Sequence, residues 1–163
     1  MMQNKLTLNE VTALIELVNK ARAQANFPTL HNSPEEQQLN ELFGTDHTLA
    51  VYGTLAPGRQ NYHIVEPLGG EWTDGLIEGT LQETGWGATQ GYPAFRPAAG
   101  GPIVQIKVLK SNALPEGWRP VDEFEGPDYQ RILVPVFYVQ DLNSTNQKLK
   151  LYTVANLYAA RDR

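Results

Sequence analysis

The 163-residue chain contains no cysteine, and this absence removes several kinds of chemistry at once. Disulfides, thiol nucleophiles and cysteine-bound metals all need a cysteine sulfur. The three histidines, His31, His47 and His63, lie 16 residues apart and show neither His-x-x-His nor metalloprotease spacing. We therefore expect no metal site.

Clusters of positive charge and long apolar runs are missing as well. Lysine and arginine are scattered, and the formal net charge is −5. Proteins that bind nucleic acid or anionic membranes usually carry clustered positive charge, so we expect neither partner. No apolar run approaches the roughly 20 residues of a membrane-spanning helix, and the N-terminus lacks the basic-then-apolar order of a signal peptide. We expect a soluble, cytoplasmic protein.

The first part of the chain differs from the rest, and we divide the sequence into a helical extension at residues 1–45 and a domain at residues 46–163. Residues 7–10 (Thr-Leu-Asn-Glu) form a capping box in front of apolar residues spaced along one helix face. Residues 33–36 (Ser-Pro-Glu-Glu) mark a second helix start, and Gly44 suits its C-terminal cap. The two helices could cover part of the domain or mediate self-association as a homodimer, although packing against a core is the commoner role.

Short strand-like runs separated by turns dominate the rest of the chain, which holds most of the 14 glycines and 11 prolines. We expect Gly79 to mark a bulge or a close backbone approach, and Pro135 to place its strand at an edge or in a bulge. We also expect Pro115 and Gly117 to delay the start of a short helix that ends near Glu125. This pattern favours a small barrel or a strongly curved mixed sheet. The expected strands are residues 48–52, 75–81, 103–109, 132–139 and 149–157.

Residues 121–131 gather the most chemistry, with four carboxylates, one arginine and one tyrosine around a Gly-Pro break. Asp122 and Glu125 are three residues apart and therefore share one face of a helical turn. Because Gly-Pro ends helices, Glu125 should lie in the last turn, at the negative end of the helix dipole. An ionised carboxylate is unfavourable there, so its pKa should rise toward the range that a general acid and base needs near neutral pH.

The acidic stretch also has a plainer interpretation. It could be a solvated turn in which a carboxylate pairs with Arg131.

A second candidate element is the glycine turn at residues 53–58, which follows a strand. It exposes main-chain N–H groups, which could bind an anion or an oxyanion. That turn lacks the Gly-Lys-Ser/Thr ending of a phosphate-binding loop and the Gly-x-Gly-x-x-Gly pattern of a dinucleotide site. Neither element decides the function by itself.

Three segments stand in order along the chain: residues 51–55 (Val-Tyr-Gly-Thr-Leu), 92–94 (Tyr-Pro-Ala) and 122–131 (Asp-x-x-Glu-Gly-x-x-Tyr-x-Arg). Together they resemble the γ-glutamylcyclotransferase-like family, including its AIG2-like and γ-glutamylamine cyclotransferase branches, over roughly residues 47–158. The third segment is the most specific. The resemblance implies an α+β fold, a small mixed β-barrel of about five to seven strands with flanking short helices.

The resemblance also implies an active site. Glu125 would be the catalytic acid and base. Main-chain N–H groups of Tyr52, Gly53, Thr54 and Leu55 would hold the carboxylate of the substrate.

Aromatic side chains would complete the pocket. The resemblance points to Tyr92, Tyr129 and Tyr152 as substrate-binding residues. Structural roles near the site would fall to Asp122, Gly126 and Arg131.

The implied reaction is an intramolecular acyl transfer that needs no metal and no cofactor. The α-amine of a small γ-glutamyl compound attacks its own γ-carbonyl, 5-oxoproline forms and an amine leaves. Two alternatives stay open. The chain could be a non-catalytic protein of the same fold that binds a small carboxylate or acts as a scaffold. It could also remove a γ-glutamyl group from a larger metabolite, which the long glycine-rich loop at residues 82–91 would permit.

Overall fold

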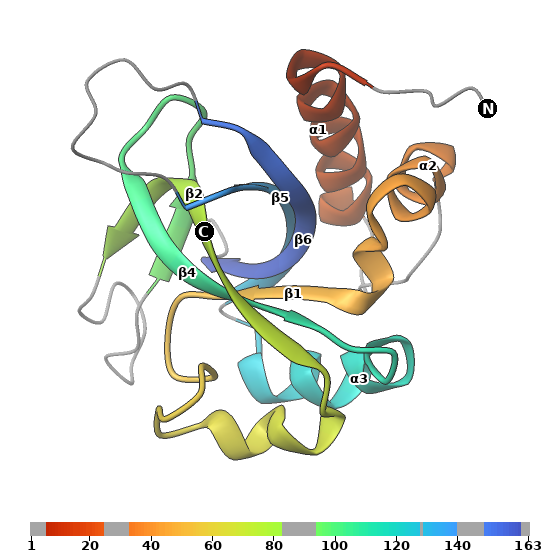
Figure 1. The fold of residues 1–163 in the computed structure, drawn as a ribbon. Coiled ribbons are helices and arrows are strands. Elements are labelled where there is room, and N and C mark those ends of the chain that lie inside the picture. Colours follow the sequence, from red (N-terminus) through yellow and green to blue (C-terminus); the bar gives the residue numbers. More distant parts are fainter. Residues whose placement is uncertain (1–5, 25–32, 83–93, 128, 140–148, 161–163) are drawn as a thin grey trace.

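The computed structural model describes residues 6–24, 33–82, 94–127, 129–139 and 149–160. Within these ranges the chain forms three α-helices, three short 3-10 helices and six strands (Figure 1). The α-helices are α1 (Leu8–Gln24), α2 (Pro34–Phe43) and α3 (Leu114–Glu125). The strands are β1 (Thr48–Val51), β2 (Glu71–Gln82), β3 (Ala94–Pro97), β4 (Ile103–Lys110), β5 (Tyr129–Phe137) and β6 (Leu151–Ala160).

Five of the strands close into a barrel, and the sixth adds an edge. The order is β3-β2-β4-β1-β6-β5, and a further pairing of β2 with β5 closes the ring. The pair β1–β6 is parallel, whereas the other pairs are antiparallel, so the barrel is mixed. Figure 1 shows the strands curving around a common centre. The expected α+β fold with a small mixed barrel is confirmed.

Successive side chains of β1 point into two different apolar clusters. On β1, Ala50 joins a buried cluster to which every barrel strand contributes, and this cluster fills the barrel. Its neighbours Leu49 and Val51 point the other way, into a cluster with Trp118 and Val121 of α3. Because successive side chains of a strand face opposite sides, one short strand fixes α3 against the outside of the barrel.

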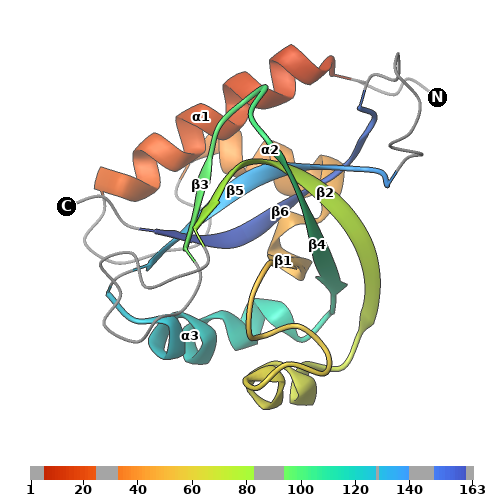
Figure 2. The same ribbon diagram turned by 90° about the vertical axis from the view of Figure 1, so that its left-hand side faces the viewer.

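Helices α1 and α2 cover another part of the barrel surface. Val11, Ile15 and Val18 of α1 pack with Leu133 of β5 in a third apolar cluster. The side-chain amide of Asn19 donates to the carbonyl of Leu133 at 2.9 Å and accepts from its N–H at 2.8 Å. Figures 1 and 2 place these helices on a different side of the barrel from α3. The extension therefore packs on the barrel, and the boundary at residue 45 stays a prediction.

A buried ion pair connects the two helices to the sheet. The guanidinium of Arg22 binds the carboxylate of Glu36 at 2.9 and 3.2 Å, and both side chains are almost fully buried. The same guanidinium donates to the side chain of Asn156 at 2.8 Å and to the carbonyl of Arg131 at 3.2 Å. Arg22 thus joins α1, α2, β5 and β6.

The predicted helix caps are confirmed. Thr7 and Glu10 exchange the two hydrogen bonds of a capping box, at 2.9 and 3.1 Å. Ser33 accepts from the N–H of Glu36 at 3.1 Å, and Gly44 closes α2 in the left-handed conformation, with φ 69°.

Several elements differ from expectation. Strand β3 was not predicted, and its four residues take their shape from pairing with β2. Helix α3 begins at Leu114, because Pro115 stands in the first turn, where no N–H is needed, and Gly117 is accommodated inside the helix. A side chain at Gly117 would meet Leu68 at 2.6 Å.

Two positional predictions can be compared with the strand registers. Gly79 is a close approach, since a Cβ there would lie 2.3 Å from the carbonyl oxygen of Arg96. The bulge near Pro135 falls between Val136 and Phe137.

None of the described helices is long and apolar enough to cross a membrane.

Candidate functional site

Glu125 is the last residue of α3, as its position before Gly126 predicts. Gly126 adopts φ 77° and donates its N–H to the carbonyl of Asp122 at 3.1 Å. A left-handed backbone suits glycine because a side chain would clash there. The glycine therefore ends the helix within one residue of Glu125 and turns the chain toward β5.

Asp122, one turn before Glu125, is bound by side chains from two strands. Arg131 of β5 binds it with Nε to Oδ1 at 2.9 Å and Nη2 to Oδ2 at 3.2 Å. The hydroxyl of Tyr158 on β6 also hydrogen-bonds to Oδ1. The guanidinium lies over the ring of Trp118 at 4.6 Å, so it contacts α3 twice. Arg131 thus pairs with a carboxylate of this stretch, as one interpretation of the sequence expected, but the pair is largely buried instead of solvated.

The carboxyl of Glu125 is partly buried, and its surroundings favour the neutral form. Burial, and secondly the negative charge of Asp122, raise the pKa of Glu125 from 4.5 to about 7. Burial acts because a charged carboxylate loses hydration in a low-dielectric setting. The pKa is therefore raised, as the sequence predicted, but its causes are burial and the charge of Asp122 rather than the predicted helix dipole. At neutral pH both protonation states are populated.

The turn after β1 packs against α3. Leu55 is buried in the cluster that holds Trp118 and Val121 of that helix. Thr54 is fixed by Asn61, whose N–H and side-chain amide donate to its carbonyl and hydroxyl, each at 2.9 Å. The turn is thus anchored by apolar contacts on one side and polar ones on the other.

This turn leaves donors available. The carbonyl of Gly53 accepts from Ala56 at 3.3 Å. Within the described part of the chain, the N–H groups of Gly53, Thr54 and Leu55 donate to no other main-chain group. Three successive N–H groups in a turn form the kind of concavity that binds a carboxylate or an oxyanion.

Tyr52, which directly precedes the turn, lies near Glu125. Its hydroxyl donates to the carbonyl of Tyr158 at 2.6 Å, and its ring packs against Phe95 with centroids 5.6 Å apart. Burial raises the pKa of the Tyr52 phenol well above its ordinary value, and the nearby charges of Glu125 and Tyr129 raise it further. Tyr52, Tyr129 and Glu125 are therefore neighbours in the fold.

One of the predicted pocket tyrosines, Tyr92, lies outside the described residues. Another, Tyr152, lies away from this cluster. Tyr152 precedes Tyr158 by six residues on β6, about 20 Å at the usual rise of a strand. Its ring instead packs against Tyr138, with centroids 4.9 Å apart, under the ammonium of Lys110.

Tyr158 is the site residue that sequence reasoning missed. Both Tyr152 and Tyr158 lie in the last strand, and the sequence alone does not say which end of β6 meets α3. The register of β5 with β6 decides it, because Arg131 is paired with Tyr158. Arg131 reaches Asp122 from that position.

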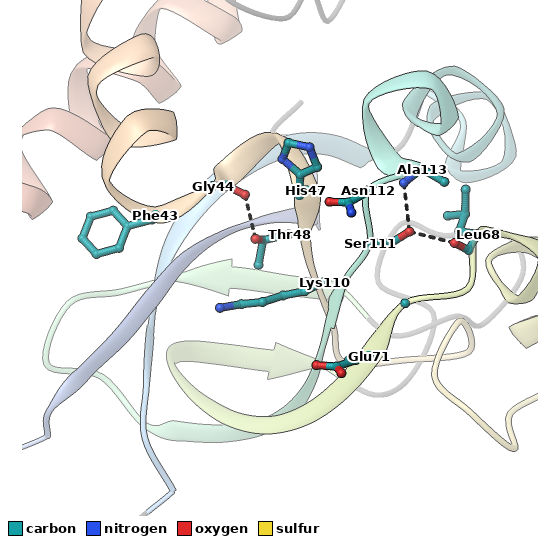
Figure 3. A pocket seen from close by; sticks show the side chains of 11 residues that line it. Phe43, Gly44, His47, Thr48, Leu68, Glu71, Lys110, Ser111, Asn112 and Ala113 are labelled. Atoms are coloured by element: carbon teal, nitrogen blue, oxygen red, sulfur yellow. Dashed lines mark hydrogen bonds between the residues drawn. The ribbon is translucent and has the colours of Figure 1, made fainter.

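A separate pocket of about 640 Å³ opens at the other end of β1 (Figure 3). Its lining includes His47, Glu71 and Lys110. Figure 3 shows the hydroxyls of Thr48 and Ser111 already engaged with main-chain groups of Gly44, Leu68 and Ala113. This pocket lies at the first residue of β1, Thr48. Tyr52 follows the last residue of β1, and Glu125 lies near Tyr52.

Within the described ranges, no three histidine, aspartate or glutamate side chains gather in a way that could hold a metal ion. The groups that do gather at the end of α3 are a carboxyl with a raised pKa, a second carboxylate held by an arginine, and a turn with available N–H donors. A carboxyl of this kind can accept and donate a proton, and main-chain N–H groups of this kind can bind an anion.

Solved structures similar to this chain were also found. An uncharacterized protein from Pyrococcus horikoshii matches 71% of this chain and 79% of its own, with 18% identity and a TM-score of 0.50. A uropathogenic E. coli-specific protein matches 71% of this chain and 80% of its own, with 16% identity and a TM-score of 0.47. A protein from Arabidopsis thaliana matches 70% of this chain and 61% of its own, with 22% identity and a TM-score of 0.46.

No curated protein matches the chain. The family described as gamma-glutamyl cyclotransferase, AIG2-like, matches residues 49–163, which include α3 and all of the barrel strands except Thr48, the first residue of β1. The chain belongs to the AIG2-like γ-glutamyl cyclotransferase family.

Proposed function

We propose that the protein is a γ-glutamyl cyclotransferase with Glu125 as its general acid and base. It would release 5-oxoproline and a free amine from a γ-glutamyl amine, a γ-glutamyl amino acid or a related small molecule. Family membership supports this type of reaction. The observation that carries the residue assignment is the partly buried Glu125 carboxyl, whose pKa is about 7, beside the turn with available N–H donors.

The reaction needs proton transfers that one carboxyl can perform in turn. The α-ammonium of the substrate cannot attack until a base removes a proton, which Glu125 accepts in its ionised form. The amine then adds to the γ-carbonyl and closes the ring. When the C–N bond to the leaving amine breaks, Glu125 gives its proton to that nitrogen. The ionised Glu125 then accepts the second proton of the ring nitrogen and passes it to the released amine, which leaves as an ammonium ion. A pKa near the working pH suits these steps, because neither protonation state is rare.

Orientation would come from the turn after β1. The N–H groups of Gly53, Thr54 and Leu55 would hold the α-carboxylate of the glutamyl group. With that end fixed, the chain of the substrate has to curl for its amine to reach its own carbonyl. An attack within one molecule gains much of its rate from such positioning. Tyr52 and Tyr129 would border the glutamyl group, because both lie near Glu125.

The test compares the wild type with Glu125→Gln, which keeps the size of the side chain and removes its proton chemistry. Each protein is incubated with a panel of γ-glutamyl amines, amino acids and peptides, and 5-oxoproline is measured by mass spectrometry. We expect release by the wild type and a loss of about 10²–10⁴-fold in the variant. Glu123→Gln is the matched control, because Glu123 is an exposed carboxylate of the same helix.

Three other outcomes would contradict this proposal or favour an alternative function. Normal turnover by Glu125→Gln would remove Glu125 from the mechanism. Saturable binding of a γ-glutamyl compound without release would favour the non-catalytic alternative. Release only from bulky amides would favour a tailoring enzyme that acts on a larger metabolite.

A further inference from the structure

We propose that Asp122 is a positioning residue that sets the pH range in which Glu125 works, and that Arg131 and Tyr158 hold it in place for that purpose. This inference rests on the proposed function of Glu125 and extends it to the residues behind it. Asp122 itself would touch no substrate.

The helix keeps Asp122 and Glu125 close together. Residues three apart on a helix are neighbours, with about 5–6 Å between their Cβ atoms. The main chain between Asp122 and Glu125 is held by the bond from the N–H of Gly126 to the carbonyl of Asp122. The Asp122 carboxylate cannot swing away, because Arg131 binds both of its oxygens and Tyr158 binds one of them.

The strand behind Asp122 is rigid as well. Arg131 is only 4% exposed, and its guanidinium lies between Asp122 and the ring of Trp118. Its carbonyl accepts a hydrogen bond from Arg22 at 3.2 Å. A negative charge held this firmly, in a partly buried place, acts on its neighbour without much screening by solvent.

The charged and titratable groups around Glu125 come from every element packed there. Helix α3 contributes Asp122, whose charge raises the pKa of Glu125. The turn after β1 contributes Tyr52, and β5 contributes Tyr129. Strand β6 contributes Tyr158, whose own pKa is raised by burial and by the charge of Asp122. Asp128 lies outside the described residues.

Among these groups, Asp122 carries the negative charge that acts on Glu125. Tyr52 and Tyr158 both have raised pKa values, so they stay neutral at working pH. Arg131 carries a fixed positive charge, which is paired with Asp122. Removing the charge of Asp122 should therefore lower the proton affinity of Glu125.

The experiment follows the Glu125 carboxyl directly by ¹³C NMR, with its signal assigned by comparison with Glu125→Gln. We expect a titration midpoint near 7 in the wild type. In Asp122→Asn it should fall by on the order of one pH unit, the scale on which a neighbouring charge shifts a carboxyl. Asp122→Glu restores the charge and should restore most of the midpoint. Glu123→Gln, which removes an exposed charge from the same helix, should not move it.

The same change should appear in turnover. The acid limb of kcat/KM against pH should move down in Asp122→Asn by the same amount as the NMR midpoint. A residue with a merely structural role would lower the rate at every pH and leave the limb in place. An unchanged Glu125 midpoint in a folded Asp122→Asn protein would overturn the proposal.

Two further readouts keep the test decisive. If Asp122→Asn does not fold, Tyr158→Phe removes one hydrogen bond to Asp122 and keeps the ion pair. The less neutralised carboxylate should then move the Glu125 midpoint up, and an unmoved midpoint would overturn the proposal. If the wild type releases no 5-oxoproline, the proposed function fails, while the NMR titrations still decide the role of Asp122.

Discussion

Replacing Glu125 with glutamine should make the protein more stable above neutral pH, although the same change abolishes the proposed activity. The folded state raises the pKa of this carboxyl from 4.5 to about 7. The folded protein therefore binds more protons than the unfolded chain between these two values, and the free energy of unfolding falls as the pH rises through that window. Below about 4.5 the carboxyl is protonated in both states and the effect vanishes.

The size of the effect follows from the shift. Each pH unit of difference between folded and unfolded pKa corresponds to about 1.4 kcal/mol. Ionised Glu125 should thus lower the free energy of unfolding by about 3 kcal/mol above pH 7, and by less to the extent that solvent screens the group. Glutamine carries no charge at any pH and avoids this loss.

The assay is urea unfolding of the wild type and Glu125→Gln at pH 4 and pH 8. We expect nearly equal midpoints at pH 4 and a midpoint about 1–2 M higher for the variant at pH 8. Glu123→Gln, an exposed carboxylate of the same helix, should follow the wild type at both values. A constant difference between wild type and Glu125→Gln at the two pH values would refute the reasoning, because only a shifted titration produces a pH-dependent difference.

Two predictions concern other parts of the fold. Glu36→Gln should lower the free energy of unfolding by about 3–5 kcal/mol, because it leaves the buried guanidinium of Arg22 without a countercharge. Urea unfolding measures this, and the exposed Glu41 of the same helix provides the control Glu41→Gln. Gly79→Ala should cost about 1–3 kcal/mol, because the new methyl group would lie 2.3 Å from both the Arg96 carbonyl and the Phe95 ring. Thermal unfolding beside Thr80→Ala, at an exposed position of the same strand, checks this, and equal stability would count against the close approach.

Local chemistry made α1 and α2 predictable. Their ends depend on hydrogen bonds between residues three positions apart, such as those of Thr7 with Glu10. The end of α3 was predictable for the same reason, because Gly126 follows Glu125 directly. In each case the signal and its structural effect lie within one turn of helix.

Tertiary contacts decided what local chemistry could not. Pro120 lies inside α3, where a proline normally disfavours a helix, yet Trp118 and Val121 on either side are buried against the barrel. Strand β3 has no strong pattern of its own and exists through its pairing with β2. The choice between Tyr152 and Tyr158 depended on the register of β6 with β5, which no local pattern encodes.

The candidate site joins these two kinds of information. Glu125 lies at a helix end that a short local signal specifies, but its raised pKa depends first on burial, which the surrounding barrel provides. Asp122 is in place because of residues on two strands that are far away in the sequence. A loss of about 3 kcal/mol from ionised Glu125 is a substantial part of the 5–15 kcal/mol by which domains are usually stable. The buried pair of Arg22 and Glu36 is linked to this site. Arg22 donates a hydrogen bond to the carbonyl of Arg131, which in turn binds Asp122. The two helices in front of the family match therefore support the strand that keeps the charge next to Glu125 in position.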